Sequence, residues 1–354
     1  MRVRCPVGRS FTEIIVRHII VIGGSAGAFA PLQQVLSGLP AGLCASVFVV
    51  LHTRASDDSH LAGVLQRSTA LRVVDVIDGA TIEPGCLYVA RPDLHLLLED
   101  GRVWAPHGPR ENRHRPAIDP LFRSAAYAYG AAVTGVVMSG CLDDGTAGAW
   151  AIKHRGGRIL VQHPDSAEYA SMPESALQHV TADAILHSCD IARTLVRWTQ
   201  ELQAQEDRAA ADDSPKPKAM NIEKSIALGS NALTAGVLEL GPPTLFTCPE
   251  CGGVLGRVNE GAVIRFRCHT GHAYTVHTLL DESLHASEDG LYAALRLLEA
   301  SLLLITTLVT EHPNTSKGGM LGTQRRRLEL QIAQLRELLQ ASFSDALGRS
   351  GTTV

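Results

Sequence analysis

The sequence of 354 residues is poor in aromatic side chains, has no strong excess of either charge and contains no long uncharged apolar run. Phe, Trp and Tyr make up 5% of it, and 32 basic residues against 36 acidic ones leave a net charge of −4. Proteins that bind nucleic acid usually carry a basic excess or a basic patch, so this balance disfavours that function. We expect no nucleic-acid partner.

The hydropathy of the chain predicts neither a membrane span nor a secretion signal. The longest uncharged apolar runs, Ile19–Ala30 and Ala131–Leu142, are shorter than the roughly 18–20 residues that cross a bilayer. Glu13, Arg17 and His18 interrupt the apolar stretch that a signal peptide would need. These absences predict a cytoplasmic protein without membrane insertion.

Disulfides are not expected in that compartment, so the eight cysteines are predicted to be thiols or metal ligands. Five of them occur singly, as small buried side chains often do: Cys5, Cys44, Cys86, Cys141 and Cys189. The other three are clustered near residue 250 and are candidate ligands.

Short β-branched runs alternate with helix-length segments from Ile19 to about Gln200, which is typical of an α/β protein. Alternating polarity within Cys86–Trp104 predicts an antiparallel hairpin at the sheet edge. The expected fold class is therefore α/β, with a doubly wound, mostly parallel sheet and an edge hairpin. The predicted parallel strands read as apolar runs buried on both faces: Ile19–Gly23, Ser46–Leu51, Arg72–Val76, Val133–Met138 and Arg158–Gln162.

Five segments are expected along the chain. A tail at 1–18 precedes the α/β domain at 19–200, and residues 201–245, rich in Ala, Asp, Lys and Pro, are typical of a linker. A small Cys- and Gly-rich module is expected at 246–275. Helical periodicity on either side of a Pro- and Gly-containing stretch predicts a helical hairpin at 276–345.

The segment Gly23-Gly24-Ser25-Ala26-Gly27 directly follows the first predicted strand. A Gly-x-Ser-x-Gly sequence at a strand-to-helix turn is typical of an exposed nucleophilic serine. A phosphate-binding loop is disfavoured, because neither a third glycine at the required spacing nor a Gly-Lys-Ser/Thr sequence follows. Ser25 is therefore a candidate nucleophile.

A nucleophilic serine needs a base and an orienting carboxylate, and the carboxyl edge of the predicted sheet offers several. His52 ends one predicted strand and His163 ends another. Asp143, Asp144 and Asp165 follow strands at the same edge. Residue chemistry alone leaves two histidines and three aspartates open.

Seven motifs follow one another between about Ile19 and Trp198: Ile22-Gly23-Gly24-Ser25-Ala26-Gly27, Val50-Leu51-His52, Pro84-Gly85-x-x-Tyr88-Val89-Ala90, Asp93-Leu94-His95, Arg115-Pro116-Ala117-Ile118-Asp119-Pro120-Leu121-Phe122, Ser139-Gly140-Cys141-Leu142-Asp143-Asp144-Gly145 and Met172-Pro173. Together they resemble the catalytic domain of CheB-type protein-glutamate methylesterases, which demethylate chemotaxis receptors. The resemblance covers about half of the chain.

The resemblance implies a triad of Ser25, His52 and Asp144, with the oxyanion held by the backbone N–H groups of Ala26 and Cys141. The implied activity is hydrolysis of glutamyl methyl esters on a methylated signalling protein, such as a chemoreceptor. Deamidation of glutamine would use the same groups. No catalytic cofactor is implied.

Two of the departures from the family pattern concern the oxyanion site and the control of activity. Leu142 stands where the family has glycine, close to the implied oxyanion site. About 18 residues precede the first predicted strand, too few for the receiver domain that these enzymes often carry, so we expect no phosphorylation control within the chain. The competing hypothesis is a non-catalytic signalling scaffold that keeps the esterase fold.

Two short turns predict a structural zinc site. Cys248 and Cys251 form a Cys-x-x-Cys-Gly sequence, and Cys268 is followed by His269 and His272. Three thiolates and one imidazole can close a tetrahedral zinc site, and His272 is preferred because its spacing leaves room for a turn. Across a flexible linker, we expect metal removal to leave the chemistry at the serine intact.

The predicted helical hairpin carries apolar residues that need a partner surface. We expect that surface to be another chain, so the helices predict a homo-oligomer.

Overall fold

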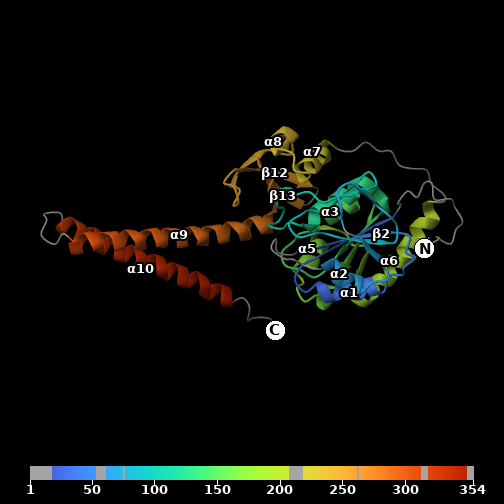
Figure 1. The fold of residues 1–354 in the computed structure, drawn as a ribbon, viewed down its shortest axis with the longest axis horizontal. Coiled ribbons are helices and arrows are strands. Elements are labelled where there is room, and N and C mark those ends of the chain that lie inside the picture. The colour runs from blue at the N-terminus through green and yellow to red at the C-terminus, as the bar shows by residue number, and fades with distance from the viewer. Residues whose placement is uncertain are drawn as a thin grey trace. The chain divides into compact units, whose positions relative to one another are not determined.

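A computed structural model describes residues 18–52, 61–74, 76–206, 218–260, 263–311 and 318–348. The chain divides into two units, Met1–Leu279 and Leu280–Val354. The first unit contains the α/β domain and the cysteine-rich segment, and the second contains most of two long helices (Figure 1).

A seven-stranded parallel sheet forms the centre of the first unit, in the strand order β10-β9-β8-β1-β2-β5-β3. This confirms the predicted parallel α/β sheet. The strands are β1 (Ile19–Gly24), β2 (Ser46–Leu51), β3 (Arg72–Val74), β5 (Cys86–Val89), β8 (Val133–Val137), β9 (Arg158–Gln162) and β10 (Ala184–Leu186).

Helices cover both faces of this sheet (Figure 1). Because side chains alternate along a strand, Ile19 and Val21 of β1 join one apolar cluster while Ile20 and Ile22 join the other. The first cluster includes α3 (Ile118–Tyr129), α4 (Thr146–His154) and α5 (Ser171–His179). The second includes α1 (Phe29–Ser37), α2 (Leu61–Gln66) and α6 (Ser188–Glu206).

The predicted edge hairpin is shorter than expected. β6 (Leu97–Glu99) and β7 (Arg102–Trp104) form it, and with β4 (Ala80–Thr81) they make a separate three-stranded sheet. Cys86–Val89, which the prediction placed in the hairpin, is instead β5, a buried strand inside the parallel sheet. All four of its residues are buried, as expected for a strand covered on both faces.

Helices occupy part of the segment predicted as a linker. They are α7 (Lys218–Ala227), α8 (Ala232–Ala235) and the 3-10 helix η3 (Val237–Glu239). Ile222, Ile226, Ala232 and Val237 form a small buried cluster between them. This apolar burial explains why the segment is ordered despite its polar composition.

The cysteine-rich segment forms a second, small antiparallel sheet, called here the small sheet. Its strands are β11 (Pro243–Thr247), β12 (Val254–Glu260), β13 (Val263–Cys268) and β14 (Ala273–Thr275). Its buried cluster consists of Cys248, Leu255, Phe266, Cys268, Tyr274 and Leu279.

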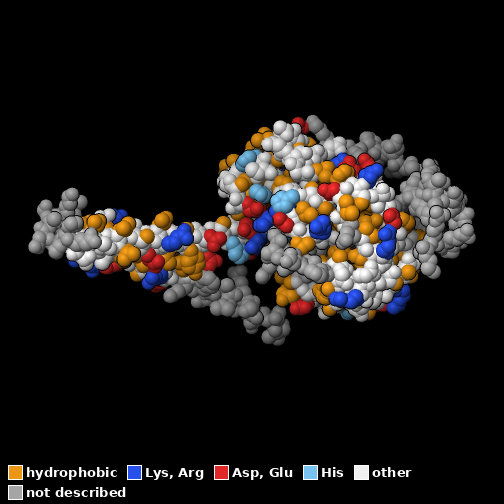
Figure 2. Space-filling view, viewed as in Figure 1, with side chains coloured by type: hydrophobic (Ala, Val, Ile, Leu, Met, Phe, Trp, Pro, Cys, Tyr) orange, Lys and Arg blue, Asp and Glu red, His pale blue; other side chains and the backbone are white. Residues whose placement is uncertain are grey.

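The second unit consists of helices. α9 (Val276–Glu311) begins in the first unit, and α10 (Gly318–Gly348) follows it. Arg336 of α10 donates to Glu299 of α9. Apolar side chains lie among charged ones along these helices (Figure 2), and several leucines are exposed, so oligomerisation through them stays a prediction. By length and composition alone, Val276–Thr310 is also long and apolar enough to cross a membrane.

Candidate active site

Ser25 lies in the turn that joins β1 to α1, at the carboxyl edge of the parallel sheet. Its backbone N–H donates to the Ser139 carbonyl at 2.9 Å, and the Ser139 hydroxyl donates to the Ala26 carbonyl at 2.8 Å. Ser139 follows β8, the neighbour of β1 in the sheet. The turn that carries Ser25 is thus fixed to the adjacent strand.

His52 is brought to Ser25 by the pairing of β1 with β2, since its N–H donates to the Gly24 carbonyl at 3.2 Å. Its Nδ1 lies 3.0 Å from Ser25 Oγ, and its Nε2 lies 2.7 Å from Asp144 Oδ2. The acidic partner fixes the proton on Nε2, which leaves Nδ1 to accept the hydroxyl proton of Ser25. The three residues of the implied triad are therefore in hydrogen-bonding order.

The other candidates have different surroundings. His163 stacks on His187, and its Nδ1 accepts from the Asp165 N–H. Asp143 has partners outside the triad: its carboxylate accepts from the hydroxyl groups of Thr275 and Thr278 at 2.7 and 3.0 Å. Two neighbouring aspartates thus have separate partners.

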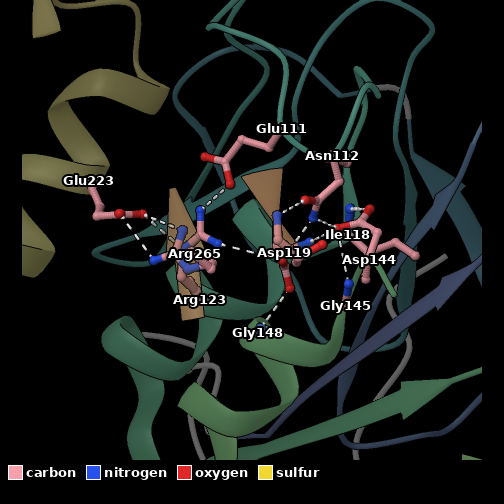
Figure 3. Close-up of polar contacts among 12 residues, drawn as sticks. Glu111, Asn112, Ile118, Asp119, Arg123, Asp144, Gly145, Gly148, Glu223 and Arg265 are labelled. Carbon is pink, nitrogen blue, oxygen red and sulfur yellow. Dashed lines mark hydrogen bonds and ion pairs between the residues drawn. The ribbon is translucent and has the colours of Figure 1, made fainter. Parts of the chain in front are cut away.

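Asp144 is buried and receives several hydrogen bonds (Figure 3). Its Oδ2 accepts from the Ile118 N–H at 2.7 Å, at the amino-terminal end of α3. Its Oδ1 accepts from Asn112 Nδ2, Asp119 N and Gly145 N at 2.9, 3.2 and 3.0 Å. Burial alone would raise its pKa, but the hydrogen bonds and the neighbouring His52 lower the pKa to about 2. The carboxylate is therefore charged when it faces the imidazole.

Three residues beside the triad were missed by the sequence reasoning. The ring of His114 stacks on that of His52 with centroids 3.5 Å apart, and burial together with His52 lowers the pKa of His114 to about 3. Burial and the charge of Asp144 raise the pKa of Asp119 to about 8. Asn112 donates to both Asp119 and Asp144. Burial thus disfavours the charged forms of both His114 and Asp119 beside the charged carboxylate.

The predicted oxyanion donors, Ala26 and Cys141, flank Ser25 from the two adjacent turns. Among the described residues, their backbone N–H groups make no hydrogen bond, whereas those of Ser25 and Gly140 donate to Ser139 O and Tyr169 O. Leu142, at the family's glycine position, has a φ of 62°, a left-handed conformation that costs a leucine energy. The turn keeps a glycine-like backbone although it carries a leucine.

The four predicted metal ligands lie together, with ligand atoms within 4.8 Å of one another. Cys251 Sγ lies 3.7 Å from Cys268 Sγ, and His272 Nδ1 lies 3.6 Å from the Sγ atoms of Cys248 and Cys268. A tetrahedral zinc with bonds of about 2.0–2.3 Å sets such separations at about 3.6–3.8 Å. The residues therefore fit a zinc ion, with His272 and not the exposed His269 in the cluster.

Glu250 supports this cluster and was missed by the sequence reasoning. Its Oε2 lies 3.3 Å from His272 Nε2, and its Oε1 accepts from the Tyr274 hydroxyl at 3.0 Å. A carboxylate on the second nitrogen of a ligating histidine fixes the ring and its proton, as in many zinc sites.

Buried charged side chains join the small sheet to the α/β domain (Figure 3). Arg267 of β13 contacts Glu111 and Glu223 at 2.7 and 3.0 Å, and Arg265 contacts Glu223 at 3.1 Å. Arg123 of α3 contacts Glu111 and Glu223 at 2.6 and 3.2 Å. These contacts link the predicted small module to the predicted α/β domain, and both lie in one compact unit. We call these five residues the charged network.

Comparisons with known proteins concern the α/β domain. The CheB methylesterase family model matches residues 20–195. A Leptospira interrogans protein named as a protein-glutamate methylesterase/protein-glutamine glutaminase is 34% identical over 182 residues, covering 51% of this chain and 94% of that protein.

Longer relatives match over a stretch of similar length. Protein-glutamate methylesterase/protein-glutamine glutaminase 1 of Xanthomonas oryzae pv. oryzae is 33% identical over 197 residues, 54% of this chain and 56% of that protein. The chain thus spans about half the length of this relative. The crystal structure of the Thermotoga maritima CheB methylesterase catalytic domain is 29% identical, covers 51% of this chain and 98% of its own, and gives a TM-score of 0.49.

Proposed function

Because the chain belongs to the CheB methylesterase family, we propose that it hydrolyses glutamyl methyl esters on a protein substrate, with Ser25, His52 and Asp144 as catalytic residues. The observation that carries this proposal is the hydrogen-bonded order of the three side chains, 3.0 Å from hydroxyl to imidazole and 2.7 Å from imidazole to carboxylate. This is the arrangement needed for nucleophilic attack assisted by a general base.

In the first half of the reaction, Ser25 Oγ attacks the ester carbonyl carbon while His52 Nδ1 takes the hydroxyl proton. The charged Asp144 stabilises the imidazolium that forms and holds the ring in place. Collapse of the tetrahedral intermediate breaks the bond to the methoxy oxygen, which takes the proton from His52 and leaves as methanol. A glutamyl-serine ester remains.

In the second half, water attacks this ester and gives a proton to His52 Nδ1. Collapse of the second intermediate returns the proton to Ser25 Oγ and releases glutamate. In both halves the N–H groups of Ala26 and Cys141 stabilise the negative oxygen, a contribution that commonly reaches about 3 kcal/mol for one donor.

The substrate follows from the relatives, which are named protein-glutamate methylesterase/protein-glutamine glutaminase. The proposed partner is a methylated, chemoreceptor-like protein, and the proposed second activity is release of ammonia from glutamine. A cytoplasmic location belongs to the same proposal, and fractionation of cell extracts tests it against the membrane-length helix α9.

The proposed metal is one structural zinc bound by Cys248, Cys251, Cys268 and His272. Its support is the donor set and the separations of the ligand atoms. The ion would hold the turns of the small sheet together. The proposed hydrolysis needs no cofactor.

Methanol release from a methylated receptor fragment, together with labelling by a fluorophosphonate, tests the proposed activity. Ser25→Ala and His52→Ala should each lower turnover by about 10⁴-fold or more, and the double variant should be no slower, because the residues act as a unit. Asp144→Asn should also reduce turnover strongly by favouring the wrong tautomer.

Matched controls are Ser37→Ala, at an exposed serine of α1, and His163→Ala. Both should keep full activity. Absence of labelling and methanol release in the unaltered protein would favour the signalling scaffold instead.

A further inference from the structure

Asn112 is a buried residue that holds two acids with one amide group. Its Nδ2 donates to Asp144 Oδ1 at 2.9 Å and to Asp119 Oδ2 at 3.0 Å. Its Oδ1 accepts from the Thr275 N–H at 3.1 Å. Since a backbone N–H can only donate, the amide oxygen must face Thr275 and the NH₂ group must face the acids. The orientation of the amide is therefore fixed by β14.

The main chain at Asn112 is held by the same strand. Its N–H donates to the Ala273 carbonyl at 2.9 Å, and the Ala273 N–H donates to the Arg110 carbonyl at 3.3 Å. Asn112 has a φ of 49°, a left-handed conformation that asparagine tolerates better than most residues. Both the side chain and the backbone of Asn112 thus depend on the small sheet.

Thr275 reaches the loop that carries Asp144 by a second route. Its hydroxyl donates to Asp143 Oδ1 at 2.7 Å, and Asp143 also accepts from the Thr278 hydroxyl. All these residues are at most 6% exposed, so water does not replace the contacts easily. One residue of β14 therefore contacts both the amide that holds Asp144 and the aspartate next to it.

The charged network fixes β14 in this place. Arg267 lies on β13, which pairs with β14 through Arg267 and Ala273. Its guanidinium contacts Glu111, the residue before Asn112, and donates to the Gly271 carbonyl at 2.7 Å. The strand, the loop at 111–112 and the amide form one connected set of directional contacts.

We propose that the small sheet is a positioning element for the proposed triad, with Asn112 as the positioning residue that aligns Asp144 and Thr275 as the link to β14. This inference rests on the proposed function, because it concerns the orientation of the carboxylate that faces His52. The small sheet lies outside the region matched by the family model. Catalysis in this chain therefore depends on a segment that the family domain does not include.

The test uses Asn112→Ala and Thr275→Val in the full chain, with Thr275→Ser as the conservative variant. Asn112→Ala should lower kcat by about tenfold to a hundredfold with KM within about twofold, which is the scale for misplacing a catalytic group slightly. Thr275→Val should lower kcat by several-fold, and Thr275→Ser, which keeps the hydroxyl, should restore it.

A spectroscopic measurement separates positioning from folding and from the proposed activity. The low-field proton resonance of the hydrogen bond between His52 and Asp144 should shift or disappear in Asn112→Ala. The control Asn231→Ala, at the start of α8 and outside the small sheet, should leave both kcat and this resonance unchanged.

An unchanged kcat and resonance in a folded Asn112→Ala variant would overturn the inference. Loss of fold in that variant leaves Thr275→Val to decide, with an unchanged resonance again overturning it. Absence of Ser25-dependent hydrolysis in the unaltered protein would overturn the proposed function alone, since the resonance still reports whether Asn112 aligns Asp144.

Discussion

The parallel sheet and the small sheet of the first unit are stabilised in different ways. The parallel sheet lies between two large apolar clusters, and every residue of β1 is buried. The small sheet has a cluster of only six buried apolar or cysteine side chains, and two arginines of β13, Arg265 and Arg267, are each only 2% exposed. One sheet depends on burial of apolar area, the other on thiols and charges.

This difference matters because the two kinds of contact differ in directionality. Apolar burial is roughly proportional to area and tolerates small shifts. Buried ion pairs and hydrogen bonds add little net stability, but they are costly to break and they fix geometry. The small sheet is therefore suited to hold Asn112 and Asp144 in a fixed position relative to each other.

The largest effect is expected from removing the cysteine cluster. Metal binding supplies roughly 10 kcal/mol or more in small zinc modules, and the small sheet has little apolar core of its own. In Cys251→Ser/Cys268→Ser, amide hydrogens of β12–β14 should lose their exchange protection while those of β1 and β8 keep it. Hydrolysis should fall in parallel, because Asn112 loses its partners.

Cys189→Ser, at an exposed cysteine, is the control for this change and should alter neither protection nor activity. Elemental analysis should find one zinc per unaltered chain. Activity that survives proven loss of the metal would restore the expectation from the sequence and show that the two sheets are independent.

A smaller loss is expected from breaking the charged network at one residue. Arg267→Met removes one of the two cations that Glu111 and Glu223 share and leaves only Arg123 between them, which should destabilise the folded protein by about 3–5 kcal/mol. Urea unfolding measures this. Arg257→Met, at an exposed arginine of β12, should change stability by less than about 0.5 kcal/mol. Equal effects of the two variants would show that the network adds nothing specific.

The smallest effect is expected from a fall in pH, which should weaken the parallel sheet and the small sheet in different pH ranges. Burial and Arg158 lower the pKa of His18, just before β1, from 6.5 to about 4. As the pH falls, His18 is protonated in the unfolded chain before it is protonated in the folded one. The free energy of unfolding should therefore fall between pH 6.5 and 4, by up to about 1.4 kcal/mol per pH unit. The pKa of Glu223 is lowered to about 2 from 4.5, despite its burial, by the three arginines, so its contribution is lost only below pH 4.5.

Urea unfolding of unaltered protein and His18→Gln at pH 7.5, 6 and 5 measures the effect. The variant should lose less stability between these pH values than the unaltered protein. An equal loss of unfolding free energy in the two proteins would show that His18 does not contribute to the pH dependence between pH 7.5 and 5.

The sequence predicted the parallel sheet well, because its strands are apolar on both faces and leave few other readings. It could not choose between His52 and His163, because both end strands at the same edge of the sheet. It also could not choose between Asp143 and Asp144, because adjacent residues of a loop can face different sides and the sequence does not show which of them faces the histidine. The resemblance to a family decided both, and the structure brings Ser25, His52 and Asp144 together.

The contribution of the small sheet could not be predicted from local patterns. Arg265 and Arg267 alternate along β13, and charged residues at this spacing usually indicate a face toward solvent. They are buried because Glu111 and Glu223, far away in the sequence, neutralise them. The role of Asn112 is equally hidden in the sequence, because the residue that orients its amide, Thr275, lies 163 residues later. Only tertiary packing brings these residues together.

The hydrogen bonds of the Asn112 amide also predict which residues should be retained together during evolution. Its oxygen is bound by β14 and its nitrogen by Asp144, so a chain that loses the small sheet leaves a buried acceptor without a donor. Related chains that lack the small sheet should then carry another residue in place of Asn112, and they need not keep Glu111. Related chains that keep the cysteine cluster should keep both residues. The esterase domain and the small sheet are therefore expected to be inherited together, as one unit of selection, although the family domain ends about fifty residues before the sheet begins.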